Sequence, residues 1–481
     1  MLQRAILENK INIKRIMLAT KKRFKNIFYS LLCTLLISLL FSVAASKAQI
    51  KGYAKLAARH NRPSIYLSTF TLPGASKDSL RLILTFNISH KMLSFKKEDK
   101  PGSFRFYARP LLSIKVYESP RNNLGFKEKV SVIDLESVAR KTWKDTVYAA
   151  NYEATNNVND FAAGFLQMKL PPGAYTYILQ FGRRENEAGT SGTRNIKLDG
   201  TQKGEIVLID SVNISQPVER LGLVNMGDNI PFRKGFYAFI RLPAYNQTKD
   251  YKLNVQQLNI SDEDTTSVKK VFESTIADED IISSVHPVLR SDGENLFLRL
   301  QSTDQGQTYA LVKIPNHKFP DAAFRIEVTE QNKENIIAQK TVQSFWVDKP
   351  ISLYDIDVAI NALGYIADEE TIKNIKSGST GERKKKFDAF WKKRDPIPDT
   401  EYNELKIEYY RRIDYAFRHY SSRSHAGFET DRGRIYILYG PPDDIERVYP
   451  RQGATREIWT YPNRRFIFKA TSGYGDFVLL E

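Results

Sequence analysis

The chain has 481 residues, of which 42% are hydrophobic and 26% are charged, and its formal net charge is +17 at pH 7. This length gives room for three domains of ordinary size, and the composition excludes a wholly disordered chain. Residues 1–48 hold nine Lys/Arg and one Glu, so +8 of the charge lies there and +9 remains on the other residues. So small a surplus does not indicate nucleic-acid binding, which needs basic residues gathered on one face.

The N-terminal segment carries the pattern of an export signal. A basic cluster at 21–25 precedes an apolar run over 27–45, and the small residues Ser46 and Ala48 place a cleavage site before Gln49. This three-part pattern predicts a secretory signal peptide over 1–48. The apolar run is also long enough to span a bilayer, so an uncleaved anchor over 27–45 is the alternative.

Cysteine usage indicates the compartment. The chain has one cysteine, Cys33, and it lies inside the apolar run. The mature chain would then have none, which excludes disulfides, thiol catalysis and cysteine metal sites. Because extracellular eukaryotic proteins of this size usually carry disulfides, the pattern favours an exported bacterial protein of the periplasm or the outer membrane.

From about 60 to 350 the sequence predicts strand after strand. Segments such as "SLRLILTFNI" and "AYTYILQFG" are rich in β-branched and aromatic residues, and Gly, Pro, Asn and Asp separate them. Short strands at this spacing favour antiparallel sandwiches, which we place over 49–205 and 206–347. A shared pattern in "KLPPGAYTYILQ" (169–180) and "HKFPDAAFRIEV" (317–328) suggests that the two are repeats.

Near residue 350 the pattern changes to helices. Apolar residues recur at three- and four-residue steps over 353–366, a second helix is expected over 382–394, and a third begins with Thr400 as its N-cap. Strands follow in "RIYILYG", "REIWTYP", "RRFIFKA" and "DFVLLE". The predicted fold class is therefore multidomain: two antiparallel β-sandwich domains, followed over 348–481 by an α+β domain with helices first and a small antiparallel sheet after them.

The second of these helices is strongly basic. "ERKKKFDAFWKKRD" (382–395) places Phe387, Phe390 and Trp391 at helical spacing between lysines and arginines. We interpret it as an amphipathic helix with a solvated basic face. Docking of that face to anionic lipid or glycan, and with it peripheral membrane association, is the alternative.

The most distinctive stretch is "GFETDRGRIYILYGPPDDIE". It resembles the signature of the GWxTD domain: Gly427, Glu429, Thr430 and Asp431 stand where the family name puts Gly, x, Thr and Asp. Phe428 stands at the position of the Trp, which keeps an aromatic ring but loses the indole N–H donor.

The resemblance covers about 350–481 and implies an envelope protein of a Bacteroidetes-type bacterium. It also agrees with the β-rich region upstream. It implies no biochemical activity, so the role of the motif has to be argued from its residues.

Taken residue by residue, the motif can be explained as structure. Gly427 and Gly433 can adopt backbone angles that other residues resist, and Phe428 can fill the junction between the long helix and the sheet. Residues 434–439 are apolar on both faces, which predicts a central strand, and the prolines that begin at Pro441 end it. Local hydrogen bonds from the Thr-Asp pair would close the turn before this strand.

Two chemical alternatives are open. His425 and Asp431, with serines nearby, could serve an envelope hydrolase, although no G-x-S-x-G elbow frames a serine. Acidic residues around Asp443 could offer oxygens to a hard cation, but no known ligand spacing is present. We therefore expect no metal site and no cofactor.

The interpretation we adopt is an exported, non-catalytic envelope protein that acts in protein–protein assembly or scaffolding. Its site is expected in the groove between the 400–420 helix and the 427–444 loop, with Arg432, Arg434 and Asp443 as binding residues. Other envelope proteins are the expected partners, and nucleic acid is not. Because the C-terminal region is rich in Tyr and Trp, glycan binding is the third hypothesis.

Overall fold

The fold is described from a computed structural model of the chain. The structure describes residues 53, 55–56, 64–74, 79–99, 105–119, 136–157, 159–183, 190–200, 203–213, 220–260, 265–293, 295–330, 335–398, 402–422, 425–471 and 476–480. The predicted signal peptide, the alternative anchor and Cys33 lie outside these residues. The chain divides into two compact units, one of residues 62–347 and the other of residues 1–61 together with 348–481.

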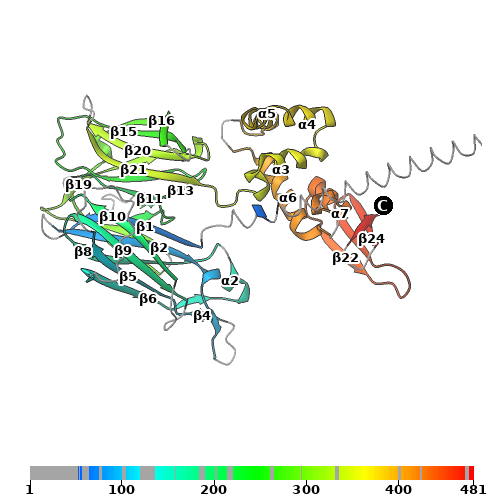
Figure 1. Ribbon diagram of the computed structural model, residues 1–481, viewed down its shortest axis with the longest axis horizontal. Coiled ribbons are helices and arrows are strands. Elements are labelled where there is room, and N and C mark those ends of the chain that lie inside the picture. The colour runs from blue at the N-terminus through cyan, green and yellow to red at the C-terminus, as the bar shows by residue number, and fades with distance from the viewer. Residues whose placement is uncertain are drawn as a thin grey trace, which may run out of the picture. The chain divides into compact units, whose positions relative to one another are not determined.

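The first half of the unit 62–347 is a sandwich of antiparallel sheets (Figure 1). One sheet has the order β1 (Ile65–Pro73), β2 (Leu80–Ser89), β8 (Phe161–Leu170), and the other has β10 (Thr190–Leu198), β9 (Gly173–Gly182), β5 (Leu111–Glu118), β6 (Ala139–Lys144). Leu82 and Phe86 of β2 share one core with Ile114 of β5. A small sheet of β3 (Lys96–Lys97), β4 (Phe106–Ala108) and β7 (Val147–Ala149), with η1 (His90–Met92) and α2 (Tyr152–Asn156), completes this half.

The second half consists of a closed barrel and a five-stranded sheet. Around the barrel run β11 (Ile206–Val212), β12 (Arg220–Leu223), β18 (Leu296–Ser302), β17 (Ile281–Ser291), β19 (Gln307–Ile314) and β14 (Phe236–Arg241). The sheet has the order β13 (Asn229–Pro231), β21 (Ile336–Phe345), β20 (Ala323–Glu330), β15 (Tyr251–Ile260), β16 (Thr265–Ile276), and η3 (Asp278–Asp280) and η4 (Asn316–Lys318) lie between strands. The prediction of antiparallel β-structure is confirmed, and β13 with β21 forms a parallel pair within it.

Strand β11 links these layers because both of its faces are buried. Ile206 and Leu208 belong to the core that the barrel shares with the five-stranded sheet. Val207 and Ile209, which point the other way, belong to a core that includes Phe70 from the first sandwich. A strand apolar on both faces needs packing partners on both sides, so the two β-halves share buried surface.

Polar contacts reinforce this interface. The Thr71 hydroxyl donates to Glu205 Oε2 at 2.6 Å, and Asn87 Nδ2 donates to the Asn225 carbonyl at 2.8 Å. Each pair joins a residue of the first sandwich to one of the second half, so the burial of these polar groups is matched by hydrogen bonds.

From residue 348 onward, the other unit is helical first. Its helices are η5 (Ile351–Tyr354), α3 (Ile356–Asn361), η6 (Ala362–Tyr365), α4 (Glu369–Lys376), α5 (Thr380–Lys392), α6 (Glu404–Tyr420), η7 (Gly427–Glu429) and α7 (Asp431–Tyr439). An antiparallel sheet follows, in the order β22 (Asp444–Val448), β23 (Arg456–Tyr461), β24 (Arg464–Ala470), β25 (Phe477–Leu479) (Figure 1). The predicted α+β order, helices and then a small antiparallel sheet, is confirmed.

Capping residues set the starts of these helices. Ser379 and Glu382 form a capping box at the start of α5. The predicted N-cap of the third helix, Thr400, lies outside the described residues. The helix begins instead at Glu404, because the Asn403 side chain accepts from the Lys406 backbone N–H at 2.8 Å.

The prediction of a central strand over 434–439 is wrong, because these residues belong to α7. A short apolar run with no polar face fits a buried helix as well as a buried strand. The Thr430 hydroxyl caps the helix by accepting from the Gly433 N–H at 3.1 Å, and Gly440 ends it at a φ of 83°. Both are helix boundary signals and were readable in the sequence.

Tyr53 belongs to the core of this unit, although the predicted boundaries assign it to the first sandwich. Its side chain is 3% exposed, and its ring stacks on Phe417 of α6 with centroids 3.8 Å apart. A residue just after the predicted export signal therefore helps to build the C-terminal fold, and the unit 62–347 is inserted between the two parts of this unit.

Candidate functional site

The most distinctive stretch of the sequence, 427–439, forms two short helical elements, η7 and α7, against α6. Gly427 is where η7 crosses α6: a Cβ there would lie 1.8 Å from the Ala416 carbonyl oxygen. Gly433 is where α7 crosses η7, because its Cβ would lie 1.8 Å from the Gly427 oxygen. Neither glycine has a positive φ, so their role is close backbone approach, whereas the sequence analysis expected unusual backbone angles.

Phe428 fills the core beneath this crossing, as expected. Its side chain is 5% exposed, and its ring lies 5.8 Å from that of Phe417. Its carbonyl accepts a hydrogen bond from the Tyr365 hydroxyl of η6. The ring and the backbone of this one residue therefore connect η7 to α6 and to η6.

Thr430 and Asp431 make the hydrogen bonds that hold α7. The Thr430 hydroxyl donates to the Gly427 carbonyl at 2.8 Å in addition to capping the helix. Asp431 Oδ2 accepts from the Leu479 N–H of β25 at 2.8 Å, and its Oδ1 lies 3.2 Å from Arg434 Nη2. Through Asp431 the motif is joined to the last strand of the sheet.

Arg432 points into the core. Its guanidinium lies 3.6 Å from Glu457 Oε2 and 4.2 Å from the Phe477 ring centroid, and burial lowers the pKa of Arg432. Glu457 also accepts from Arg447 Nε at 3.0 Å and from the Trp459 indole N–H at 2.7 Å. The carboxylate therefore has charged and neutral donors, as a buried charge requires.

The three predicted binding residues point in different directions. Arg432 is buried against the sheet, whereas Arg434 is partly exposed beside Asp431. Asp443 is exposed, and its N–H donates to the Thr460 carbonyl at 2.8 Å. The structure does not bring these side chains into one site.

Side chains occupy the space between α6 and α7 where the groove was expected. Tyr415 of α6 stacks on Tyr436 of α7 with ring centroids 4.2 Å apart. Further along, Arg412 Nη1 donates to the Ile437 carbonyl at 3.2 Å. Aromatic and arginine side chains thus make this a packed helix–helix contact.

The structure also shows what His425 and Asp431, the two residues considered for a hydrolase, contact. His425 is exposed, and its N–H donates to the Ser422 hydroxyl at 3.1 Å. Asp431 directs its two oxygens to Leu479 and Arg434. These contacts give Asp431 a clear structural function.

A cleft lies on the other side of the motif, where the sequence analysis did not place a site. Its volume is about 420 Å³, and it is lined by Asn361, Ala362, Gly364, Tyr365, Phe428 and Glu429. Burial raises the pKa of Tyr365, and the nearby Arg434 charge opposes this rise. The cleft is within the size range of ligand sites, and motif residues form one of its walls. Only the tertiary fold brings η6 beside η7, so periodicity could not reveal it.

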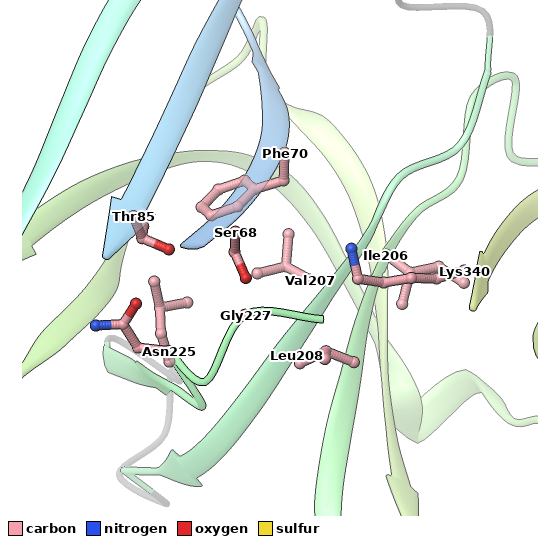
Figure 2. Close-up of a pocket in the computed structure, with 10 residues that line it drawn as sticks. Ser68, Phe70, Thr85, Ile206, Val207, Leu208, Asn225, Gly227 and Lys340 are labelled. Atoms are coloured by element: carbon pink, nitrogen blue, oxygen red, sulfur yellow. The ribbon is translucent and has the colours of Figure 1, made fainter. Parts of the chain in front are cut away.

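A smaller cavity lies between the two β-halves (Figure 2). Its volume is about 20 Å³, enough for a single water molecule. Figure 2 shows Ser68 and Thr85 of the first sandwich together with Val207 and Asn225 of the second half around it. Its size and position fit a packing defect at the shared interface better than a ligand site.

The described residues offer neither a metal site nor a membrane-spanning helix. No group of three or more His, Cys, Asp or Glu side chains there could hold a metal ion. No helix in that part of the chain is long and apolar enough to cross a membrane.

Comparison with known proteins gives one family. Residues 327–473 match the family model of the GWxTD domain. No curated protein matches the chain.

Among solved structures, the C-terminal domain of the Streptococcus pyogenes antigen I/II-family protein AspA is 8% identical to this chain. The match covers 59% of this chain and 100% of that domain, with a TM-score of 0.13. The C-terminal domain of the Streptococcus agalactiae AgI/II polypeptide BspA is 8% identical and covers 58% and 100%, with a TM-score of 0.14. Superpositions this loose support no statement about fold or function.

Proposed function

The chain contains a GWxTD domain, and from this premise we propose that it is an exported, non-catalytic envelope protein that acts in protein–protein assembly or scaffolding. The N-terminal basic and apolar segments support export, and the absence of cysteine after residue 33 supports a bacterial envelope. Residence in the periplasm or at the outer membrane of a Bacteroidetes-type bacterium is part of this proposal.

One observation carries the proposal: the polar groups of the motif hold the fold together. Thr430 caps α7, Asp431 binds the β25 backbone, and Arg432 pairs with Glu457 in the core. Because these contacts join two helices to the last strand, they keep the surface around the motif in a fixed shape. The cleft beside it is the surface we assign to the partner, since the lining residue Glu429 offers a charge next to the aromatic Tyr365.

The test is a mild crosslink in cells that naturally produce the protein, tagged at its C-terminus, followed by purification of the envelope and mass spectrometry. We expect one stable set of envelope proteins with the wild type. In the variant Gly364→Arg this set should be lost, because Gly364 lines the cleft and has open space around its Cβ position. The melting temperature should not change.

Gly381→Arg is the matched control. Its Cβ position is also open, but it lies on α5 and does not line the cleft. This variant should keep the partners. If Gly364→Arg keeps them as well, the cleft is not the docking site. If the wild type is recovered alone and soluble, the scaffold proposal is wrong.

A further inference from the structure

The small sheet β3–β4–β7, located in Figure 1 by its label β4, has one buried face and one exposed face. Ala108 of β4 and Ala149 of β7 are 1% and 4% exposed, and Val147 packs against the sandwich core. Side chains alternate along a strand, so Tyr107 and Tyr148, which are opposite each other in the register, lie on the other face. The Tyr148 side chain is 50% exposed. This face is therefore open to solvent.

Basic residues lie around the two tyrosines on the exposed face. Lys96 of β3 is opposite Tyr107 in the register. The guanidinium carbon Cζ of Arg105 lies 4.5 Å from the centroid of the Tyr148 ring, and that of Arg109 lies 5.5 Å from the centroid of the Tyr107 ring. All three basic residues are exposed. We call this surface the basic aromatic face: Lys96, Arg105, Tyr107, Arg109 and Tyr148.

Positive charge exceeds negative charge on the basic aromatic face. Lys96 and Arg109 form no ion pair with the residues that the structure describes. Arg105 is opposite Glu98, whose N–H donates to the Arg105 carbonyl at 2.9 Å, so the Glu98 carboxylate offsets part of the charge. The remaining cations attract an anionic partner.

The tyrosines also hold the guanidinium groups in place. A guanidinium group over an aromatic ring is attracted by the negative face of the ring. This attraction restricts the side chains of Arg105 and Arg109 before a ligand arrives. Less side-chain entropy is then lost on binding.

We propose that the basic aromatic face binds an acidic polysaccharide, a polymer whose sugar rings carry carboxylate groups. Guanidinium groups pair with carboxylates through two parallel hydrogen bonds. A tyrosine offers apolar ring surface to the C–H groups of a sugar and a hydroxyl to its polar groups. Arg105 and Arg109 are separated by about 13 Å of extended chain, so they can contact different sugars of one polymer.

Single-stranded nucleic acid is the competing polyanion. Its bases bind by stacking on exposed aromatic rings. Here a guanidinium group lies over Tyr107 and another over Tyr148, which leaves less ring surface for a base. Acidic polysaccharide is therefore the ligand we infer. The face belongs to the β-rich unit, whereas the cleft belongs to the other unit, so this inference does not depend on the scaffold function.

The experiment titrates the full chain with polygalacturonate by calorimetry, with dextran as the neutral reference. The wild type should bind polygalacturonate and not dextran, and binding should weaken as the salt concentration rises. In Lys96→Gln and in Arg109→Gln the dissociation constant should rise about tenfold, as expected when one charge-assisted hydrogen bond is lost. Tyr148→Ala should also weaken binding, because the sugar loses its contact with the ring.

Matched controls come from exposed residues of the same unit. Arg290→Gln removes an exposed arginine of β17, and Tyr152→Ala removes a tyrosine that is 69% exposed and lies beside Phe106. Both variants should bind polygalacturonate as the wild type does. Because Lys96 and Arg109 are exposed, their replacement should leave the melting temperature unchanged.

Three results would overturn the proposal. The first is binding of polygalacturonate no stronger than that of dextran. The second is equal weakening of binding by Arg109→Gln and Arg290→Gln, which would indicate a general charge effect. The third is tighter binding of oligo-dT than of polygalacturonate with loss of this binding in Arg109→Gln, which would assign the face to nucleic acid.

Discussion

At Gly427 and Gly433 the backbones of α6, η7 and α7 come so close that only hydrogen fits between them. The sequence shows two glycines six residues apart, but it does not show which backbone each one meets. The reason for each glycine is a steric contact that appears only when three elements are packed together. By contrast, the expectation that Phe428 is buried rested on hydrophobicity alone, and the structure agrees with it.

The first prediction concerns Gly427→Ala. The added methyl group would overlap the Ala416 carbonyl, so we expect a loss of about 1–3 kcal/mol in the free energy of unfolding, the usual cost of overpacking. The measurement is urea unfolding of the full chain. Gly381→Ala is the control, because its Cβ would meet nothing within 4 Å and alanine favours the helix. Equal stability of the two variants would refute the close-contact explanation.

At the scale of elements, α7 shows why sequence patterns can mislead. Its residues favour strands, but the segment forms a helix that packs against α6, η7 and β25. Tertiary packing overrides propensity in this way when a segment is short and apolar all round. Strands β23, β24 and β25 were predicted correctly, whereas no strand was predicted where the charged edge strand β22 lies.

The second prediction concerns how the stability of the β-rich unit, which contains His286 on strand β17, depends on pH. Burial, and to a smaller extent the charge of Arg81, lower the pKa of His286 below its usual 6.5. Below pH 6.5 the unfolded chain therefore takes up a proton at His286 more readily than the folded chain, so stability falls as the pH drops through this window. His286→Gln should lose less stability between pH 7 and pH 5. Unfolding midpoints measured across that range would decide the matter, and parallel curves for variant and wild type would contradict it.

At the scale of the whole molecule, the chain leaves and re-enters one of its units. Tyr53 lies in the core with α6, the β-rich unit follows, and the chain returns at residue 348. The β-rich unit is consequently tied at both of its ends. Within it, the core that contains Phe70 and Val207 joins the sandwich to the barrel.

The third prediction concerns Tyr53→Ala. Removing a ring that is 3% exposed should cost the C-terminal unit about 3–5 kcal/mol and leave the β-rich unit unchanged. Hydrogen exchange of the full chain can report the two units separately. Tyr152→Ala, at a tyrosine that is 69% exposed, should change neither. Full protection of α6 in Tyr53→Ala would show that the N-terminal segment is dispensable.

The sequence by itself determined what depends on composition and local pattern: a β-rich region followed by helices and a small antiparallel sheet, and the GWxTD signature. The alternation of apolar residues in strands and their three- and four-residue spacing in helices are local patterns. They can therefore be read without knowledge of the fold. The tertiary structure alone decided that Tyr53 completes a distant core and that Arg432, Arg434 and Asp443 point apart. It also placed the cleft beside the motif. Each of these depends on contacts between segments far apart in the chain, and no short window of sequence contains both partners.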